Sequence, residues 1–99
     1  MKLKDLRESA DRASIFLKSL ANPQRLRILC LIMEQERPVG ELAEAVELNQ
    51  SAVSQHLALM RREGLLKTRR EGQTIYYQLA DRNVTRFFGL LEDMFCKRR

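Results

Sequence analysis

The chain has 99 residues, with 18 Lys and Arg against 13 Asp and Glu, giving a formal charge of +5. A chain of this length buries only about 65% of its unfolded surface, which excludes a large enclosed active site. We therefore expect one domain spanning residues 1–99 and a second copy as partner. A 44% hydrophobic fraction excludes disorder, and the lack of a long apolar stretch excludes a membrane span. Without an apolar signal segment the expected location is cytoplasmic, where cysteines are thiols.

The first two helices are predicted from hydrophobic spacing and capping residues. Apolar side chains recur at steps of three and four over residues 3–20, which predicts one helix with a narrow stripe suited to another helix. A second helix should begin at Asn22 as N-cap and Pro23 as first residue, and end near Glu36. It is apolar on most sides, so we place it in the core.

Two further helices around a short turn predict a helix-turn-helix. Residues 39–46 form the first, residues 47–49 the turn, and residues 50–63 the second, with Asn49 or Ser51 as N-cap and Gly64 after its end. From there the apolar period changes to two. Residues 66–70 and 74–79 read as strands joined by a turn at 71–73.

A last helix, capped by Asp81, carries an apolar arc wider than one core face requires, and another subunit should cover part of it. The fold class is therefore mainly α with a small β-hairpin. The order is four helices, a hairpin and a final helix, which is that of a winged helix-turn-helix domain.

The helix at residues 50–63 offers a face suited to DNA. Ser51, Ser54, Gln55 and Arg62 share one side, opposite an apolar stripe. Gln and Ser can pair with base edges in the major groove, and a helix N-terminus attracts phosphate. Each residue alone could equally be solvated surface, but their position after a helix-turn-helix turn favours DNA.

Basic residues near the hairpin tip form a second candidate DNA contact. Lys67, Arg69 and Arg70 could neutralise phosphates, or could simply solvate an exposed strand edge. We favour the phosphate contact.

His56, the only histidine, has no neighbouring nucleophile or further ligands at suitable spacing, so catalytic and metal roles are not supported. It is either a hydrogen-bonding residue packed under its helix or a phosphate contact. The chain also lacks a phosphate-binding loop and a nucleophile motif, so we expect neither an enzyme nor a cofactor.

The two cysteines, Cys30 and Cys96, are too far apart in sequence for a C-x-x-C pair. From the residues alone, Cys30 reads as a small buried hydrophobe in a core helix, and Cys96 as a chance residue near the chain end.

Several segments together resemble the ArsR/SmtB family of dimeric winged-helix repressors. They are residues 20–29, 39–42, 50–57, 64–66 and 75–79, which include a Ser-x-x-Ser-x-His-Leu segment and a Tyr-Tyr strand. The resemblance implies Gln50, Ser51, Ser54 and Gln55 as base readers. It also implies a homodimer formed through the first and last helices. The apolar residues that we assign to this interface are Leu3, Leu6, Ala10, Ala13, Leu17, Phe87, Phe88, Leu91, Met94 and Phe95.

Departures from the family's metal sensors argue against a metal site. The helix at residues 39–46 lacks cysteines and the last helix lacks histidine. The placement of Cys30 and Cys96 is instead similar to the BigR, SqrR and HlyU-like branch, which senses persulfides and oxidants. The resemblance thus implies a repressor of operator DNA whose affinity falls when the two cysteines become bridged. The alternatives are an activator that relieves silencing by competing for promoter DNA and, further off, a dimerising scaffold.

Overall fold

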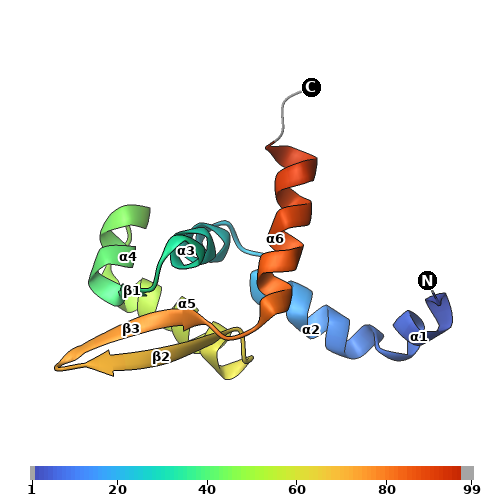
Figure 1. Ribbon diagram of the computed structural model, residues 1–99, viewed down its shortest axis with the longest axis horizontal. Helices are drawn as coiled ribbons and strands as arrows, with labels where there is room; N and C mark the ends of the chain where they lie inside the picture. Colours follow the sequence, from blue (N-terminus) through green and yellow to red (C-terminus); the bar gives the residue numbers. More distant parts are fainter. Residues whose placement is uncertain (1, 97–99) are drawn as a thin grey trace.

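The computed structural model describes residues 2–96 and contains the predicted succession of helices, hairpin and final helix (Figure 1). The elements are α1 (Leu3–Glu8), α2 (Ala10–Leu20), α3 (Pro23–Glu34), β1 (Arg37–Pro38), α4 (Val39–Val46), α5 (Gln50–Arg62), β2 (Leu66–Glu71), β3 (Thr74–Leu79) and α6 (Arg82–Phe95). The mainly helical winged helix-turn-helix fold is therefore confirmed, with two differences at the level of elements.

The first difference is a break in the predicted helix over residues 3–20. The chain leaves helical geometry at Ser9, whose φ is −100° and ψ is 9°, and continues as α2. Serine competes for backbone hydrogen bonds and favours helix ends. Here its hydroxyl also accepts a hydrogen bond of 3.0 Å from the Arg12 guanidinium. Because α1 buries none of its residues, no packing within the subunit opposes the break.

The second difference is a third strand. α3 ends at Glu34, two residues before the predicted end, and Arg37–Pro38 then pairs antiparallel with β3. The sheet order is β1-β3-β2. Proline disfavours helical geometry in the residue before it, so the chain is extended here. A two-residue strand is too short for an alternating pattern to reveal it.

The core surrounds α3, as its nearly all-round apolar sequence predicts. Asn22 caps this helix by accepting hydrogen bonds from the backbone N–H groups of Gln24 and Arg25. Ile28 and Leu29 are fully buried. Buried side chains from the following helices complete this cluster: Leu42, Val53, Leu57 and Met60.

The turns lie where the sequence predicts, except that Glu71 belongs to β2, so the hairpin turn is residues 72–73 and not 71–73. Asn49, and not Ser51, caps α5, accepting from the Ala52 N–H at 2.8 Å. Gly64 and Gly72 take positive φ, after α5 and in the hairpin turn respectively. The hairpin pairs Leu66 with Leu79 through to Glu71 with Thr74. This register fixes which hairpin side chains lie together.

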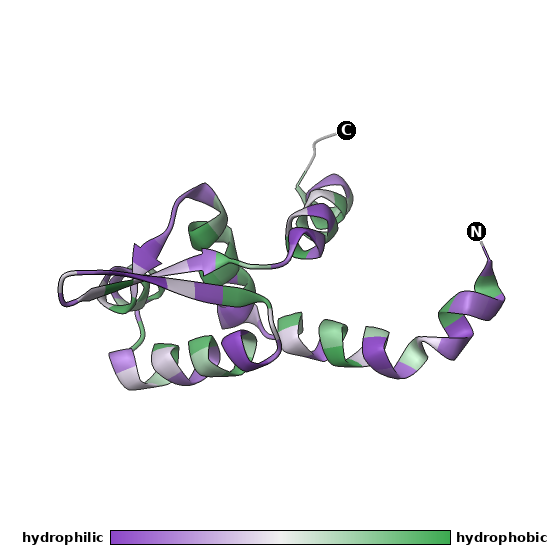
Figure 2. Ribbon diagram, turned by 60° about the horizontal axis from the view of Figure 1, so that its bottom comes forward, coloured by the Kyte–Doolittle hydropathy of each residue, from purple (hydrophilic) through white to green (hydrophobic). Residues whose placement is uncertain are grey.

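α1, α2 and α6 project away from the body formed by the other elements (Figure 1). The radius of gyration is 14.8 Å, larger than the roughly 13 Å of a compact domain of this size. Apolar residues remain exposed along the projecting helices, where green bands are visible in Figure 2. They are Leu3, Leu6, Ile15, Leu17, Leu90, Met94 and Phe95.

Phe88 differs from the other predicted interface residues. Its side chain is only 9% exposed and belongs to the core of its own subunit, so it is largely covered without a partner. Phe87 is half-buried and stacks edge to face on Phe16 of α2, with ring centres 5.9 Å apart. No helix among residues 2–96 is long and apolar enough to cross a membrane.

Candidate DNA interface and cysteine groove

The outer face of α5 carries the predicted base-reading residues. Gln50, Ser51, Ser54, Gln55 and Arg62 are all exposed, while Val53, Leu57 and Met60 on the opposite side are fully buried. Packing of the apolar stripe therefore orients the polar face outward. Between this face and the hairpin lies a hollow of about 390 Å³, lined by Ser54, Ala58, Arg61, Arg62 and Tyr77. Arg61 was not singled out from the sequence.

His56 faces inward, toward α3. The Arg25 Nε donates a hydrogen bond of 3.1 Å to the His56 Nδ1, and the Arg25 Nη1 donates to the Lys18 carbonyl at 3.3 Å. Burial and the charge of Arg25 lower the pKa of His56, so the ring is neutral at pH 7. Of the two alternatives, this geometry matches a residue packed under its helix. Arg25 lies 31 positions away, and no sequence signal links it to His56.

Arg69 of the hairpin is held by an ion-pair network. Its guanidinium pairs with Glu36 and with Glu71, and lies 4.6 Å from the centre of the Tyr76 ring. Glu36 also accepts a hydrogen bond from Gln78. The bonds from Arg69 and Gln78 lower the pKa of Glu36, so it stays ionised. Arg69 is thus engaged within the protein, whereas Lys67 and Arg70 are exposed.

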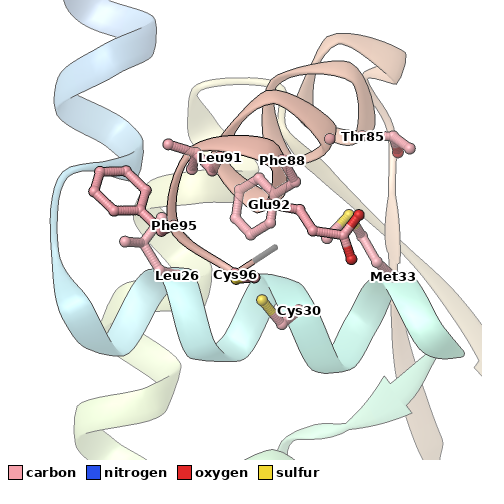
Figure 3. Close-up of a pocket in the computed structure, with 10 residues that line it drawn as sticks. Leu26, Cys30, Met33, Thr85, Phe88, Leu91, Glu92, Phe95 and Cys96 are labelled. Atoms are coloured by element: carbon pink, nitrogen blue, oxygen red, sulfur yellow. The ribbon is translucent and has the colours of Figure 1, made fainter. Parts of the chain in front are cut away.

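The two cysteines line one groove between α3 and α6. Its volume is about 540 Å³, and the lining residues are Leu26, Cys30, Met33, Thr85, Phe88, Gly89, Leu91, Glu92, Phe95 and Cys96 (Figure 3). Figure 3 shows Cys96 at the end of α6, over the part of α3 that carries Cys30. Residues distant in sequence are therefore brought together by the fold.

Cys30 is exposed, so its interpretation as a buried hydrophobe was wrong. α3 buries Ile28, Leu29 and Ile32, and Cys30 lies on the side of this helix that faces the groove. Partial desolvation in the groove raises the pKa of the Cys30 thiol, and the charges of Cys96 and Glu34 add to this effect.

Cys96 is the C-cap of α6, where its N–H donates to the Glu92 carbonyl at 2.9 Å. A helix end can shift without disturbing the interior of the helix. The two free thiols therefore lie on separate elements, and that of Cys96 lies at a helix end that can shift. Residues 2–96 contain no group of three or more His, Cys, Asp or Glu side chains arranged to hold a metal ion.

Comparison with known proteins agrees with this architecture. The family profile of bacterial regulatory proteins of the arsR family matches residues 22–68. The transcriptional activator HlyU of Vibrio cholerae is 43% identical, covering 98% of this chain and 90% of HlyU. The chain belongs to the arsR family of bacterial regulatory proteins. The biofilm growth-associated repressor of Agrobacterium fabrum is 36% identical over 92% of this chain and 78% of that protein.

Solved structures of bacterial transcriptional regulators have the same fold. Reduced HlyU from Vibrio cholerae superposes with a TM-score of 0.86 at 42% identity, covering 95% of this chain and 99% of HlyU. The transcriptional repressor BigR from Xylella fastidiosa gives a TM-score of 0.91 at 32% identity, covering 99% of this chain and 100% of BigR. The homodimeric winged helix-turn-helix DNA-binding domain Mb0332 from Mycobacterium bovis gives a TM-score of 0.79 at 35% identity, covering 91% of this chain and 84% of that domain. The chain is accordingly a transcriptional regulator.

Proposed function

We propose that this chain, as a single unit over residues 1–99, is a homodimeric DNA-binding repressor that senses oxidants or reactive sulfur through Cys30 and Cys96. The observation that carries the proposal is that both thiols line one groove between α3 and α6. A disulfide or polysulfide bridge within the subunit would tie these helices together and lower operator affinity. A solved relative, HlyU, is designated as reduced, which is consistent with a redox-active protein of this type.

The exposed face of α5 would read base edges in the major groove. Gln50, Ser51, Ser54 and Gln55 lie toward its N-terminal half, and Arg62 near its end suits a phosphate. Lys67 and Arg70, exposed on the hairpin, would contact neighbouring phosphates. We leave His56 and Arg69 out of the direct contacts because both are engaged within the protein.

The projecting helices would form the dimer. Exposed apolar residues on α1, α2 and α6 leave surface that a second copy can cover, and a homodimeric relative has this fold. Two copies of α5 must reach successive major grooves, about 34 Å apart. Changes in the position of α6 therefore alter how well both helices fit DNA.

α3 connects the groove to the DNA-reading helix. Leu26 and Cys30 line the groove, while the adjacent Arg25 holds His56 of α5. A bridge that draws α6 against α3 would strain this contact. Coupling free energies in such switches are about 1–3 kcal/mol, or roughly 5–150-fold in affinity.

The test compares DNA affinity across thiol states. Operator duplexes are first selected from a random pool with the reduced protein, and binding is then followed by fluorescence anisotropy. Treatment with sodium tetrasulfide or hydrogen peroxide should weaken wild-type binding roughly 5–150-fold. Mass spectrometry should show a bridge between Cys30 and Cys96. The Cys30→Ser and Cys96→Ser variants should bind like the reduced wild type in all conditions. Full DNA release by both variants would refute the proposal.

A second candidate is an activator that competes with a silencing protein for promoter DNA. This candidate is favoured because the chain is 43% identical in sequence to the activator HlyU, against 36% to the biofilm growth-associated repressor. Transcription in vitro separates the two. A repressor lowers transcript from a bare template that contains the selected site. An activator of this kind leaves that transcript unchanged and raises it only on a template already coated with a silencing protein.

A further inference from the structure

We infer that the oxidant which this groove selects is a neutral, apolar organic hydroperoxide, with the apolar body held between α3 and α6 and the O–O bond at the two thiols. This inference rests on the proposed function and narrows its effector class. It is carried by the walls of the groove, its charges and its position relative to the remaining apolar surface of α6.

The groove has the size and walls of a small-molecule site. Ligand pockets typically measure 300–1,000 Å³, and this one has about 540 Å³. Leu26, Met33, Phe88, Leu91 and Phe95 give it apolar walls. Burying a phenyl-sized group against such walls is worth roughly 10–100-fold in affinity. Hydrogen peroxide, which has no apolar body, gains nothing from them.

The charges beside the thiols favour a neutral peroxide over an anionic one. Glu92 is the only charged residue that lines the groove among residues 2–96. Glu34 lies close enough to raise the pKa of Cys30 and is partly offset by an ion pair with Arg37 at 2.9 Å. Two carboxylates disfavour an anionic peroxide such as peroxynitrite relative to a neutral hydroperoxide.

The groove lies on the side of α6 opposite Leu90 and Met94, whereas Phe95, the most exposed apolar residue of this helix at 75%, lines the groove. Residues three and four apart share a face of a helix. The face of α6 toward the groove therefore carries Thr85, Gly89, Glu92 and Cys96, and the opposite face carries Leu90 and Met94. A second copy that covers only Leu90 and Met94 on α6 leaves the groove open, whereas one that also covers Phe95 closes part of its rim. Leu91 and Phe95 lie at the boundary between the two faces.

A bound apolar body also compensates for a weakly ionised thiol. The raised pKa of Cys30 reduces its thiolate fraction at neutral pH, and thiolate is the form that attacks peroxides. Dilute hydrogen peroxide should therefore react slowly. A hydroperoxide held in the groove reacts from a high local concentration instead.

The reaction balances with the two thiols as reductant. One thiolate attacks the distal peroxide oxygen and the O–O bond breaks. The alkoxide takes a proton and leaves as the alcohol, and the attacking cysteine becomes a sulfenic acid. The other thiol then attacks this sulfur, so an S–S bond forms and water leaves. Two electrons pass from the thiols to the peroxide. The terminal position of Cys96 on α6 allows the approach.

The experiment measures rate ratios. Bridge formation in the full-length protein is timed by quenched mass spectrometry with cumene hydroperoxide and with hydrogen peroxide, and each rate is divided by that of free cysteine. In the wild type, the normalised rate with cumene hydroperoxide should exceed the normalised rate with hydrogen peroxide roughly tenfold or more. Gly89→Leu should fill the groove and bring the ratio near one. Gly89→Ala is the matched control, since a Cβ at Gly89 has no neighbour within 4 Å.

Cumyl alcohol provides a second test that needs no variant. As a competitor for the groove it should slow bridging by cumene hydroperoxide and leave the hydrogen peroxide rate unchanged. A wild-type ratio near one, or no competition, overturns the inference while bridging and DNA release by tetrasulfide still support the proposed function. Absence of any bridge with tetrasulfide or either peroxide refutes the proposed function itself.

Discussion

At the scale of single residues, the contact between Arg25 and His56 makes stability depend on pH. Arg25 donates to the His56 Nδ1, which requires a neutral ring. The pKa of His56 is lowered by burial and by Arg25, so the unfolded chain binds the proton more tightly than the folded one. Stability is then complete above the unfolded pKa of about 6.5 and falls as the pH drops below it.

We therefore expect the free energy of unfolding to decrease between pH 7.5 and pH 5.5, by no more than about 1.4 kcal/mol per unit of pH below 6.5. Thermal unfolding at fixed ionic strength measures it. His56→Gln keeps an acceptor that does not titrate and should flatten the dependence. An equal loss of stability in this variant would contradict the assignment. Glu36 does not titrate between pH 5.5 and pH 7.5, because its pKa is lowered from the ordinary value of a carboxyl group.

The cysteines show what a sequence reveals about single residues and what it does not. The N-caps at Asn22 and Asp81 were predictable because capping depends on neighbours in the chain. The exposure of Cys30 was not, since it depends on where α6 crosses α3, a contact between residues far apart in sequence. The resemblance to sulfur-sensing regulators suggested the pair, and the fold places both thiols at one groove.

At the scale of elements, the hairpin is fastened to the body through Arg69. Arg69 pairs with Glu36, in the segment between α3 and β1, and this pair adds to the β1–β3 pairing that joins the hairpin to the body. Alternation predicted the first long strand, and β-branched and aromatic residues predicted the second. The network instead joins Arg69 to Glu36, 33 positions apart, and polar spacing carries no such signal. Two adjacent arginines therefore have different environments, one enclosed by carboxylates and one exposed.

This difference predicts different salt dependences for DNA binding. Replacing exposed Lys67 with Ala should reduce the slope of log affinity against log salt by about 0.9 for each phosphate that the lysine neutralises. Arg69→Ala should change the slope by less than half of that, because Glu36 and Glu71 already neutralise its charge. Affinity measured over a salt series tests both. An equal change of slope in the two variants would show that Arg69 reaches phosphate.

At the scale of the whole molecule, the exposed apolar face of α6 predicts a dimer. The double variant Leu90→Glu with Met94→Glu should weaken self-association by at least roughly 30-fold, about 2 kcal/mol, because it buries charge in the interface. Sedimentation equilibrium measures the dissociation constant. Ile75→Glu, at a comparably exposed apolar position on β3, is the matched control and should leave association unchanged. A dimer as tight as wild type would place the interface elsewhere.

The break at Ser9 has a consequence for the supply of the regulator. A helix of six residues that buries none of them is too short to persist alone in water. In the homodimer that we propose, a neighbouring copy would give α1 a surface to fold upon, so its folding would become part of assembly. Proteases should then cut α1 in unassembled subunits more readily than in assembled ones. Degradation would then remove mainly the subunits that lack a partner. In this way the break at Ser9 would help to set the amount of regulator in a cell.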